Sequence, residues 1–169
     1  METLNRFTFN EISESSVIAD LRLYHPLFKE LNFKSSSIIF HNGSLIQLND
    51  TQVLYKEGAG DCLVYIVLCG RLIVYTQYGD VLSVVRAGEC VGEEAFMSSQ
   101  WNYRKESCVS DGVSYLLAID SNSMKEIKEQ FVIYGYQHNY LVLMRILEDS
   151  FRRKQRRRKL LSNYWFEIC

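Results

Sequence analysis

The chain has 169 residues, of which 47% are apolar and 23% are charged. These values are typical of a globular domain that builds its own core without disulfides or metal. No run of eighteen apolar residues is present, and the first residues lack the basic and apolar stretches of a secretory signal. We therefore expect a cytoplasmic protein with no transmembrane helix.

The net charge of −1 hides a strong asymmetry along the chain. Residues 152–159 read RRKQRRRK and carry seven positive charges, so the rest holds 12 Lys and Arg against 20 Asp and Glu, a net charge of −8. Such a pattern predicts an acidic body and a basic tail that contact different partners.

The five cysteines include no CxxC pair and have no histidine cluster near them in the sequence. This pattern indicates neither a zinc site nor a redox motif. We expect reduced thiols, with Cys62, Cys69, Cys90 and Cys108 packed as small core residues.

Residues 11–34 have the apolar spacing of helices, with a break at Pro26, and a turn follows at Asn42-Gly43. Between residues 45 and 120, short runs rich in Val, Ile, Leu and Tyr alternate with glycine and aspartate turns. Seven runs are expected to be strands: LIQL, VLY, LVYIVL, RLIVY, VLSVV, SCV and SYLLAI. No helical pattern separates them, which favours a sandwich or barrel.

Helices are expected again after residue 120. Ser123 with Glu126 fits a capping box, which predicts that a first helix begins there. Gly135 is expected to interrupt this helix. A second helix is expected to run from Gln137 into the basic segment. We expect three parts: an N-terminal helical segment at 1–44, a β-domain at 45–120, and C-terminal helices with a basic tail at 121–169.

The stretch Gly88–Phe96 (GECVGEEAF), followed by Arg104, is the most informative motif. Gly92 allows the backbone to approach a ligand closely, and a short turn after it can direct amide groups at an anion. A carboxylate at Glu93 can accept hydrogen bonds from a sugar hydroxyl, and the guanidinium of Arg104 can bind a phosphate. The combination is suited to a sugar phosphate.

The order of these elements resembles the cyclic nucleotide-binding domain family, over roughly residues 45–151. The segments that carry the resemblance are EGAGD at 57–61, VYIV at 64–67, Gly70, YGD at 78–80, Gly88, GEEAF at 92–96 and RKESC at 104–108. The resemblance implies a mainly β fold, an eight-stranded jelly-roll barrel with N-terminal helices and C-terminal lid helices. One residue more than is usual between Asp61 and Gly70 suggests a β-bulge.

The resemblance also implies roles for single residues. Glu93 would bind the ribose 2′-hydroxyl and Arg104 the cyclic phosphate, with Gly92, Glu94 and Ala95 in the turn around it. The Ser107 hydroxyl would complete the site. An aromatic ring from the lid would face the base, and the candidates are Tyr134, Tyr136 and Tyr140.

Two readings of the function follow. In the first, the chain is a non-catalytic regulatory module that binds a cyclic nucleotide and moves its C-terminal helix. In the family, a threonine often follows the arginine in cGMP binders. Lys105 stands at that position here, which favours cAMP over cGMP. In the second, Glu106 pairs with Arg104, because residues i and i+2 of a strand share a face. The pocket would then be degenerate, and the chain a scaffold subunit of a larger assembly such as a cytoskeletal or ciliary one.

The basic segment has three interpretations. It is a solvated helix end whose cations suit the helix dipole, a contact to an acidic partner such as a protein, a nucleic acid or a membrane surface, or a segment like a nuclear-localisation signal. Its candidate contact residues are Arg152, Arg153, Lys154, Arg156, Arg157, Arg158 and Lys159. No DNA-binding domain is evident, and no nucleophile, phosphate-loop, metal or kinase motif points to an enzyme. We expect no metal or other cofactor beyond the possible nucleotide ligand.

Overall fold

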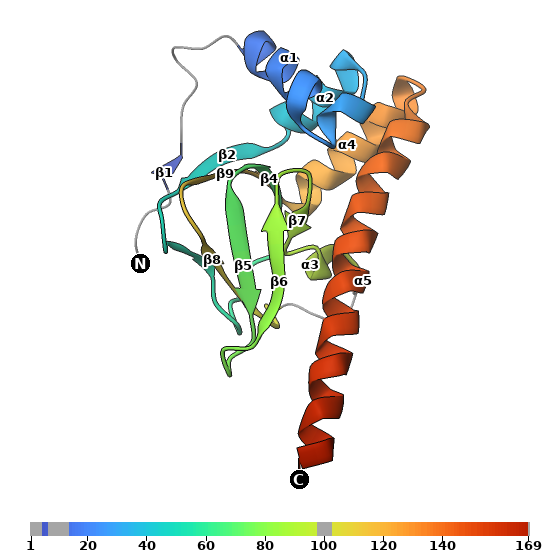
Figure 1. The fold of residues 1–169 in the computed structure, drawn as a ribbon. Helices are drawn as coiled ribbons and strands as arrows, with labels where there is room; N and C mark the ends of the chain where they lie inside the picture. Colours follow the sequence, from blue (N-terminus) through green and yellow to red (C-terminus); the bar gives the residue numbers. More distant parts are fainter. Residues whose placement is uncertain (1–4, 7–13, 98–102, 169) are drawn as a thin grey trace.

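The computed structural model describes residues 5–6, 14–97 and 103–168, and its β-strands form two antiparallel sheets (Figure 1). The first sheet has the order β1(Asn5–Arg6), β2(Ser44–Leu48), β9(Ser114–Ile119), β4(Val64–Cys69) and β7(Cys90–Val91). The second sheet has the order β3(Val53–Tyr55), β8(Ser107–Ser110), β5(Arg71–Tyr75) and β6(Val81–Arg86).

All seven expected strands are confirmed to within a residue. The strands β1 and β7 were not expected, because two residues are too few to show an alternating pattern. The register of β4 against β9 shifts between Val67 and Cys69, which confirms the predicted bulge.

The expected eight-stranded jelly-roll barrel with helices at its ends is confirmed only in part. Within the described residues the sheets contain five and four strands, and no pairing joins their edges. The arrangement is therefore an open jelly-roll sandwich, and α5(Gln137–Ile168) packs against β6 and β7 where the two sheets part. A covering helix protects exposed strand edges as closure would.

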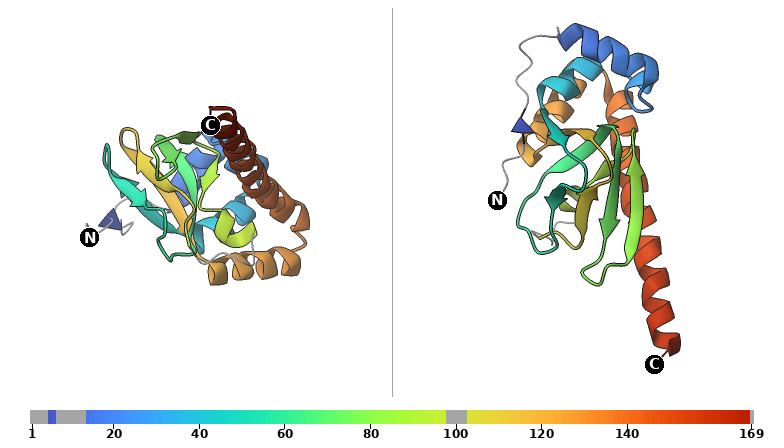
Figure 2. Two further views of the ribbon diagram at one scale, coloured as in Figure 1. Left: turned by 90° about the horizontal axis from the view of Figure 1, so that it is seen from below. Right: turned by 60° about the vertical axis from the view of Figure 1, so that its left-hand side comes forward.

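Helices gather at one end of the sandwich. They are α1(Glu14–Tyr24), the short 3-10 helix η1(Phe28–Glu30), α2(Phe33–His41) and α4(Ser121–Ile133). Figures 1 and 2 show that α5 begins at this end, runs along the sandwich and extends past its opposite end. No helix of the described chain is long and apolar enough to cross a membrane.

The expected helix boundaries after residue 120 are partly right. The cap of α4 is Asp120, whose carboxylate accepts a 2.7 Å hydrogen bond from the Ser123 amide, so Ser123 is not the cap. Gly135, with φ of +72°, does separate α4 from α5. Helix α5 then runs without interruption through the basic segment.

The first sheet is buried on both faces because its strands alternate between two cores. Val64 and Ile66 of β4 pack against the helices, whereas Tyr65 and Val67 pack between the sheets. The prediction for the cysteines is half right: Cys90 and Cys108 are buried, but Cys62 and Cys69 are exposed. Cys62 lies two residues before β4 and Cys69 is its last residue, where the chain leaves the cores.

Candidate functional site

Gly92 and Arg104 form one side of the site, at the end of the sandwich nearest α3(Glu94–Met97). The φ of Gly92 is +78°, and a Cβ there would overlap the Arg104 guanidinium. Arg104 Nη1 donates a 3.1 Å hydrogen bond to the Gly92 carbonyl. Only glycine permits this approach of the backbone to Arg104, and the predicted approach of the backbone to a ligand stays a prediction.

The Arg104 side chain is buried and well partnered. Its Nη2 pairs with Asp61 and donates to the Leu63 carbonyl, and its guanidinium carbon lies 4.3 Å from the centre of the Tyr55 ring. Burial lowers the pKa of Arg104, but the hydrogen bond to Asp61 and the surrounding charges more than offset this, so the side chain stays charged. Its Nε is buried without a hydrogen-bond partner among the described residues.

Glu93 forms the other side and is fully buried. It contacts a residue from the basic segment: Lys154 Nζ lies 2.7 Å from Oε1 of Glu93 and donates a 2.9 Å hydrogen bond to Oε2. The same ammonium group lies 2.6 Å from Oε1 of Glu106. Lys154 thus bridges two buried carboxylates.

Burial is the largest single influence on the pKa of Glu93 and on the pKa of Lys154. It raises the pKa of Glu93, and Lys154 offsets part of that effect. It lowers the pKa of Lys154, but Glu93 and Glu106 together hold that pKa above its usual range. The ammonium is therefore charged, and its two carboxylate partners are what make a buried lysine tolerable.

Arg158 lies one turn beyond Lys154 on α5 and closes the same side. It pairs with Glu94 at the start of α3 and with Glu106. Burial lowers the pKa of Arg158, and Glu106 and Glu94 raise it by more. Two consecutive turns of the basic helix are thereby fixed to three carboxylates of the site.

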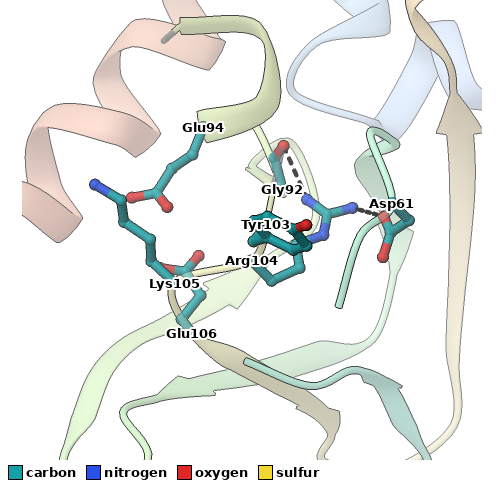
Figure 3. Close-up of a pocket in the computed structure, with 7 residues that line it drawn as sticks. All are labelled: Asp61, Gly92, Glu94, Tyr103, Arg104, Lys105 and Glu106. Atoms are coloured by element: carbon teal, nitrogen blue, oxygen red, sulfur yellow. Dashed lines mark hydrogen bonds and ion pairs between the residues drawn. The ribbon is translucent and has the colours of Figure 1, made fainter. Parts of the chain in front are cut away.

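Little space remains between these groups. The cavity bounded by Asp61, Gly92, Glu94, Arg104 and Glu106 has a volume of about 10 Å³, enough for roughly one water molecule. Figure 3 shows Arg104 between Gly92 and Asp61, with Glu94 and Glu106 on the side facing α5. Pockets that hold small-molecule ligands have volumes of about 300–1,000 Å³, so this one is too small for such a ligand.

The predicted pairing of Arg104 with Glu106 is wrong. Strand β8 begins only at Ser107, so Arg104 and Glu106 lie in irregular backbone, where the two-residue alternation does not apply. Arg104 pairs with Asp61 instead, and Glu106 faces Lys154 and Arg158.

Ser107 and Ala95 were also predicted at the site. The Ser107 hydroxyl is buried and accepts a 3.0 Å hydrogen bond from the Glu57 amide. Ala95 lies in α3, and its side chain is outside the described part of the structure.

The three tyrosines predicted to face a base do not line the cavity. They lie at the helical end: Tyr134 stacks under Lys34, whose Nζ is 3.5 Å from the ring centre, and Tyr140 packs edge-on against Phe131. Tyr136 lies beside Tyr134, with ring centres 6.2 Å apart. The part of α5 that faces the site begins about four turns later, at Arg153.

The sequence missed the roles of Asp61, Lys154 and Arg158 in the site. The spacing of Lys154 and Arg158, four residues apart, places them on one helix face, but a run of seven cations conceals that spacing.

Among the described residues, no group of three or more His, Cys, Asp or Glu is placed to hold a metal ion.

Comparisons with known proteins agree with this geometry. A family model described as "Cyclic nucleotide-binding domain" matches residues 45–131, just over half of the chain. Comparison with curated protein sequences finds no match.

Three solved structures illustrate the similarity in fold. A putative cyclic nucleotide-binding protein from Geobacter metallireducens is 16% identical with a TM-score of 0.61, over 86% of this chain and 99% of that one. A cyclic nucleotide-binding domain from Methylobacillus flagellatus is 17% identical with a TM-score of 0.64, over 85% and 81%. The catabolite activator protein of Thermus thermophilus is 20% identical with a TM-score of 0.61, over 81% of this chain and 63% of that one.

Such low identities support the fold alone, whereas the family model includes the Gly92–Arg104 motif. The chain belongs to the cyclic nucleotide-binding domain family.

Proposed function

We propose that the chain is a non-catalytic regulatory domain that binds a cyclic nucleotide between Glu93 and Arg104. One observation carries this proposal. Oε1 of Glu93 makes no hydrogen bond and is held only by its ion pair with Lys154, and the buried Nε of Arg104 has no hydrogen-bond partner in the described chain. Unsatisfied buried polar atoms are costly, and they concentrate at functional sites. A ribose hydroxyl can donate to the first atom, and a phosphate oxygen can accept from the second.

The remaining predicted site residues have supporting roles in the proposal. Gly92 keeps the backbone close to Arg104, and the amides of the α3 turn, near Glu94 and Ala95, face the anion. Ser107 can still donate its hydroxyl proton, because its hydroxyl acts as the acceptor in its hydrogen bond with the Glu57 amide. We propose cAMP rather than cGMP as the ligand, because Lys105 follows Arg104 where cGMP-binding relatives often carry threonine.

Calorimetric titration of the purified chain with cAMP and with cGMP tests the proposal, beside the variant Arg104→Ala. We expect micromolar or tighter binding of cAMP, about −8 kcal/mol, weakened at least tenfold by the loss of a charge-assisted contact. Arg71→Ala is a matched control, since Arg71 forms an exposed ion pair with Asp111 and is remote from the cavity. Equal affinities for all three proteins would contradict the proposed site.

A second candidate function rests on the closed cavity. With about 10 Å³ available and Lys154 buried against Glu93, the domain has the features of a pocket filled by its own helix. It would then act as a scaffold subunit, for example in a cytoskeletal or ciliary assembly, and present its basic helix to a partner. Absence of nucleotide binding at millimolar concentration, including by variants that free the pocket, would favour this function.

The basic segment remains a proposed partner-binding surface in either case. Arg152, Arg153, Lys154 and Arg158 pair with carboxylates of the same chain. Arg156, Arg157 and Lys159 are exposed, so we propose these three as the contacts to an acidic partner.

A further inference from the structure

Helix α5 occupies the site with two side chains, Lys154 and Arg158. We propose that these two residues, the Lys154–Arg158 plug, hold the pocket closed, and that a cyclic nucleotide enters only when the C-terminal half of α5 withdraws. This inference rests on the proposed function and specifies how the same site is regulated.

The plug takes the position of the ligand. Lys154 Nζ contacts both oxygens of Glu93, at 2.7 and 2.9 Å, so its ammonium occupies the hydrogen-bonding positions that a ribose hydroxyl needs. A cavity of about 10 Å³ leaves no room for a nucleotide beside it. Ligand and plug are therefore mutually exclusive.

Charge balance favours the closed form when no ligand is present. The site holds the carboxylates of Asp61, Glu93, Glu94 and Glu106, and without α5 they face the two cations Arg104 and Lys105. The plug adds two cations, so withdrawal leaves three carboxylates without their partners on α5. The open form is a minority state, and the apparent affinity for nucleotide falls in proportion to its population.

The helix is built so that one half can move while the other stays. Leu143 and Leu147 anchor the first half in the core beneath the helical end. Beyond them the described contacts to the body include ion pairs, from Arg153 to Glu89 and from the plug to the site, and the packing of Leu161 against the core between the sheets. Withdrawal beyond Leu147 breaks these contacts and leaves the core beneath the helical end intact.

The test compares cAMP affinity by calorimetry in the wild-type chain, in the unplugged variant K154M/R158Q, and in the control R156Q/K159Q, which removes two neighbouring charges outside the plug. We expect at least tenfold tighter binding in the unplugged variant and no change in the control. Glu106→Gln provides a milder opening should the double variant fail to fold, because it weakens both plug contacts and leaves Glu93 and Arg104 untouched.

Cys90 gives a second readout that does not depend on affinity. This buried thiol lies under α5 where the withdrawing part begins: its Sγ is 3.8 Å from the Ile146 carbonyl, and its side chain also contacts Ser150, three residues beyond Leu147. In a chain carrying Ser at Cys62, Cys69 and Cys169, we expect cAMP to accelerate modification of Cys90 by N-ethylmaleimide. Cys108, inside the sandwich core, reports any global unfolding.

The outcomes separate the two proposals. Equal cAMP affinity with and without the plug, and Cys90 modification that cAMP does not change, would overturn the plug while leaving the proposed function intact. Weaker binding by the unplugged variant would also overturn it, because Lys154 and Arg158 would then be ligand contacts. No binding by any folded variant at millimolar cAMP would overturn the proposed function, and the regulation with it.

Discussion

The carboxylate of Glu93 and the ammonium of Lys154 meet inside the molecule, 2.7 Å apart, although 61 residues separate them in the sequence. The contact joins the turn after β7 to the middle of α5. It makes the basic helix part of the site, so a change at either residue affects both the pocket and the packing of α5.

The variant Glu93→Gln tests how much this contact contributes to the free energy of unfolding. The amide removes one of the two carboxylates that compensate a fully buried ammonium, and we expect the free energy of unfolding to fall by about 1–3 kcal/mol, as for hydrogen bonds to charged groups. Urea denaturation measures it. Glu30→Gln breaks an exposed pair of the same 2.7 Å length with Arg145 and should cost less than about 1 kcal/mol. Equal costs for both variants would mean that burial gives the inner pair no special weight.

Gly92→Ala tests the close approach of the backbone to Arg104. A left-handed residue with a Cβ costs about 1–2 kcal/mol, and at this position the Cβ also overlaps the guanidinium and the Leu63 carbonyl. Gly79→Ala is the matched control, with φ of +88° and no atom within 4 Å of the added Cβ. Thermal unfolding should show the larger loss for Gly92→Ala. Equal losses would indicate that Arg104 moves aside without cost.

The sequence predicted the strands well, because their runs of Val, Ile and Leu are bounded by glycine and aspartate. It also predicted Glu93 and Arg104 as site residues, because the Gly-Glu turn and the arginine after it are local patterns, and that role stays a prediction. It did not identify Asp61 as the partner of Arg104 or Lys154 as the partner of Glu93, since neither pairing leaves a periodic signal. Long-range ion pairs depend on how α5 lies against the sandwich, which pattern alone does not specify.

We expect the buried His25 to make the stability of the fold depend on pH. The ring is buried between α1 and η1, with Nε2 donating to the Val67 carbonyl at 2.8 Å and Nδ1 accepting from the Phe28 amide. Burial lowers the pKa of His25 below its usual 6.5, and the hydrogen bond to Val67 opposes this only in part. The unfolded chain therefore takes up a proton first as the pH falls, so stability is full above about pH 6.5 and declines below it.

The pH dependence is measured by urea denaturation between pH 8 and pH 5. His25→Gln removes the titrating ring, so its stability should be lower at pH 8 but fall less steeply toward pH 5. Parallel profiles for the two proteins would assign the acid sensitivity to other groups.

The four described cysteines should react in two classes. Cys62 and Cys69 are exposed, whereas burial raises the pKa of Cys90 and of Cys108 to about 12. The thiolate is the reactive form, so without nucleotide a thiol reagent at pH 7.5 should modify the first two quickly, Cys90 slowly and Cys108 only on unfolding. Peptide mass spectrometry distinguishes the sites. Rapid modification of Cys108 in the folded chain would contradict the burial of β8.

The outward side of the basic helix should be dispensable for folding but not for binding. Arg156, Arg157 and Lys159 are exposed, so the triple variant R156Q/R157Q/K159Q should unfold within about 0.5 kcal/mol of the wild type. Retention on immobilised poly-glutamate should fall, because three charges free to meet an anion are gone. Lys154→Gln is the converse control: it removes an inward charge, so it should destabilise the fold and change retention little. A triple variant that is retained as strongly as the wild type would place the anion-binding surface elsewhere on the chain.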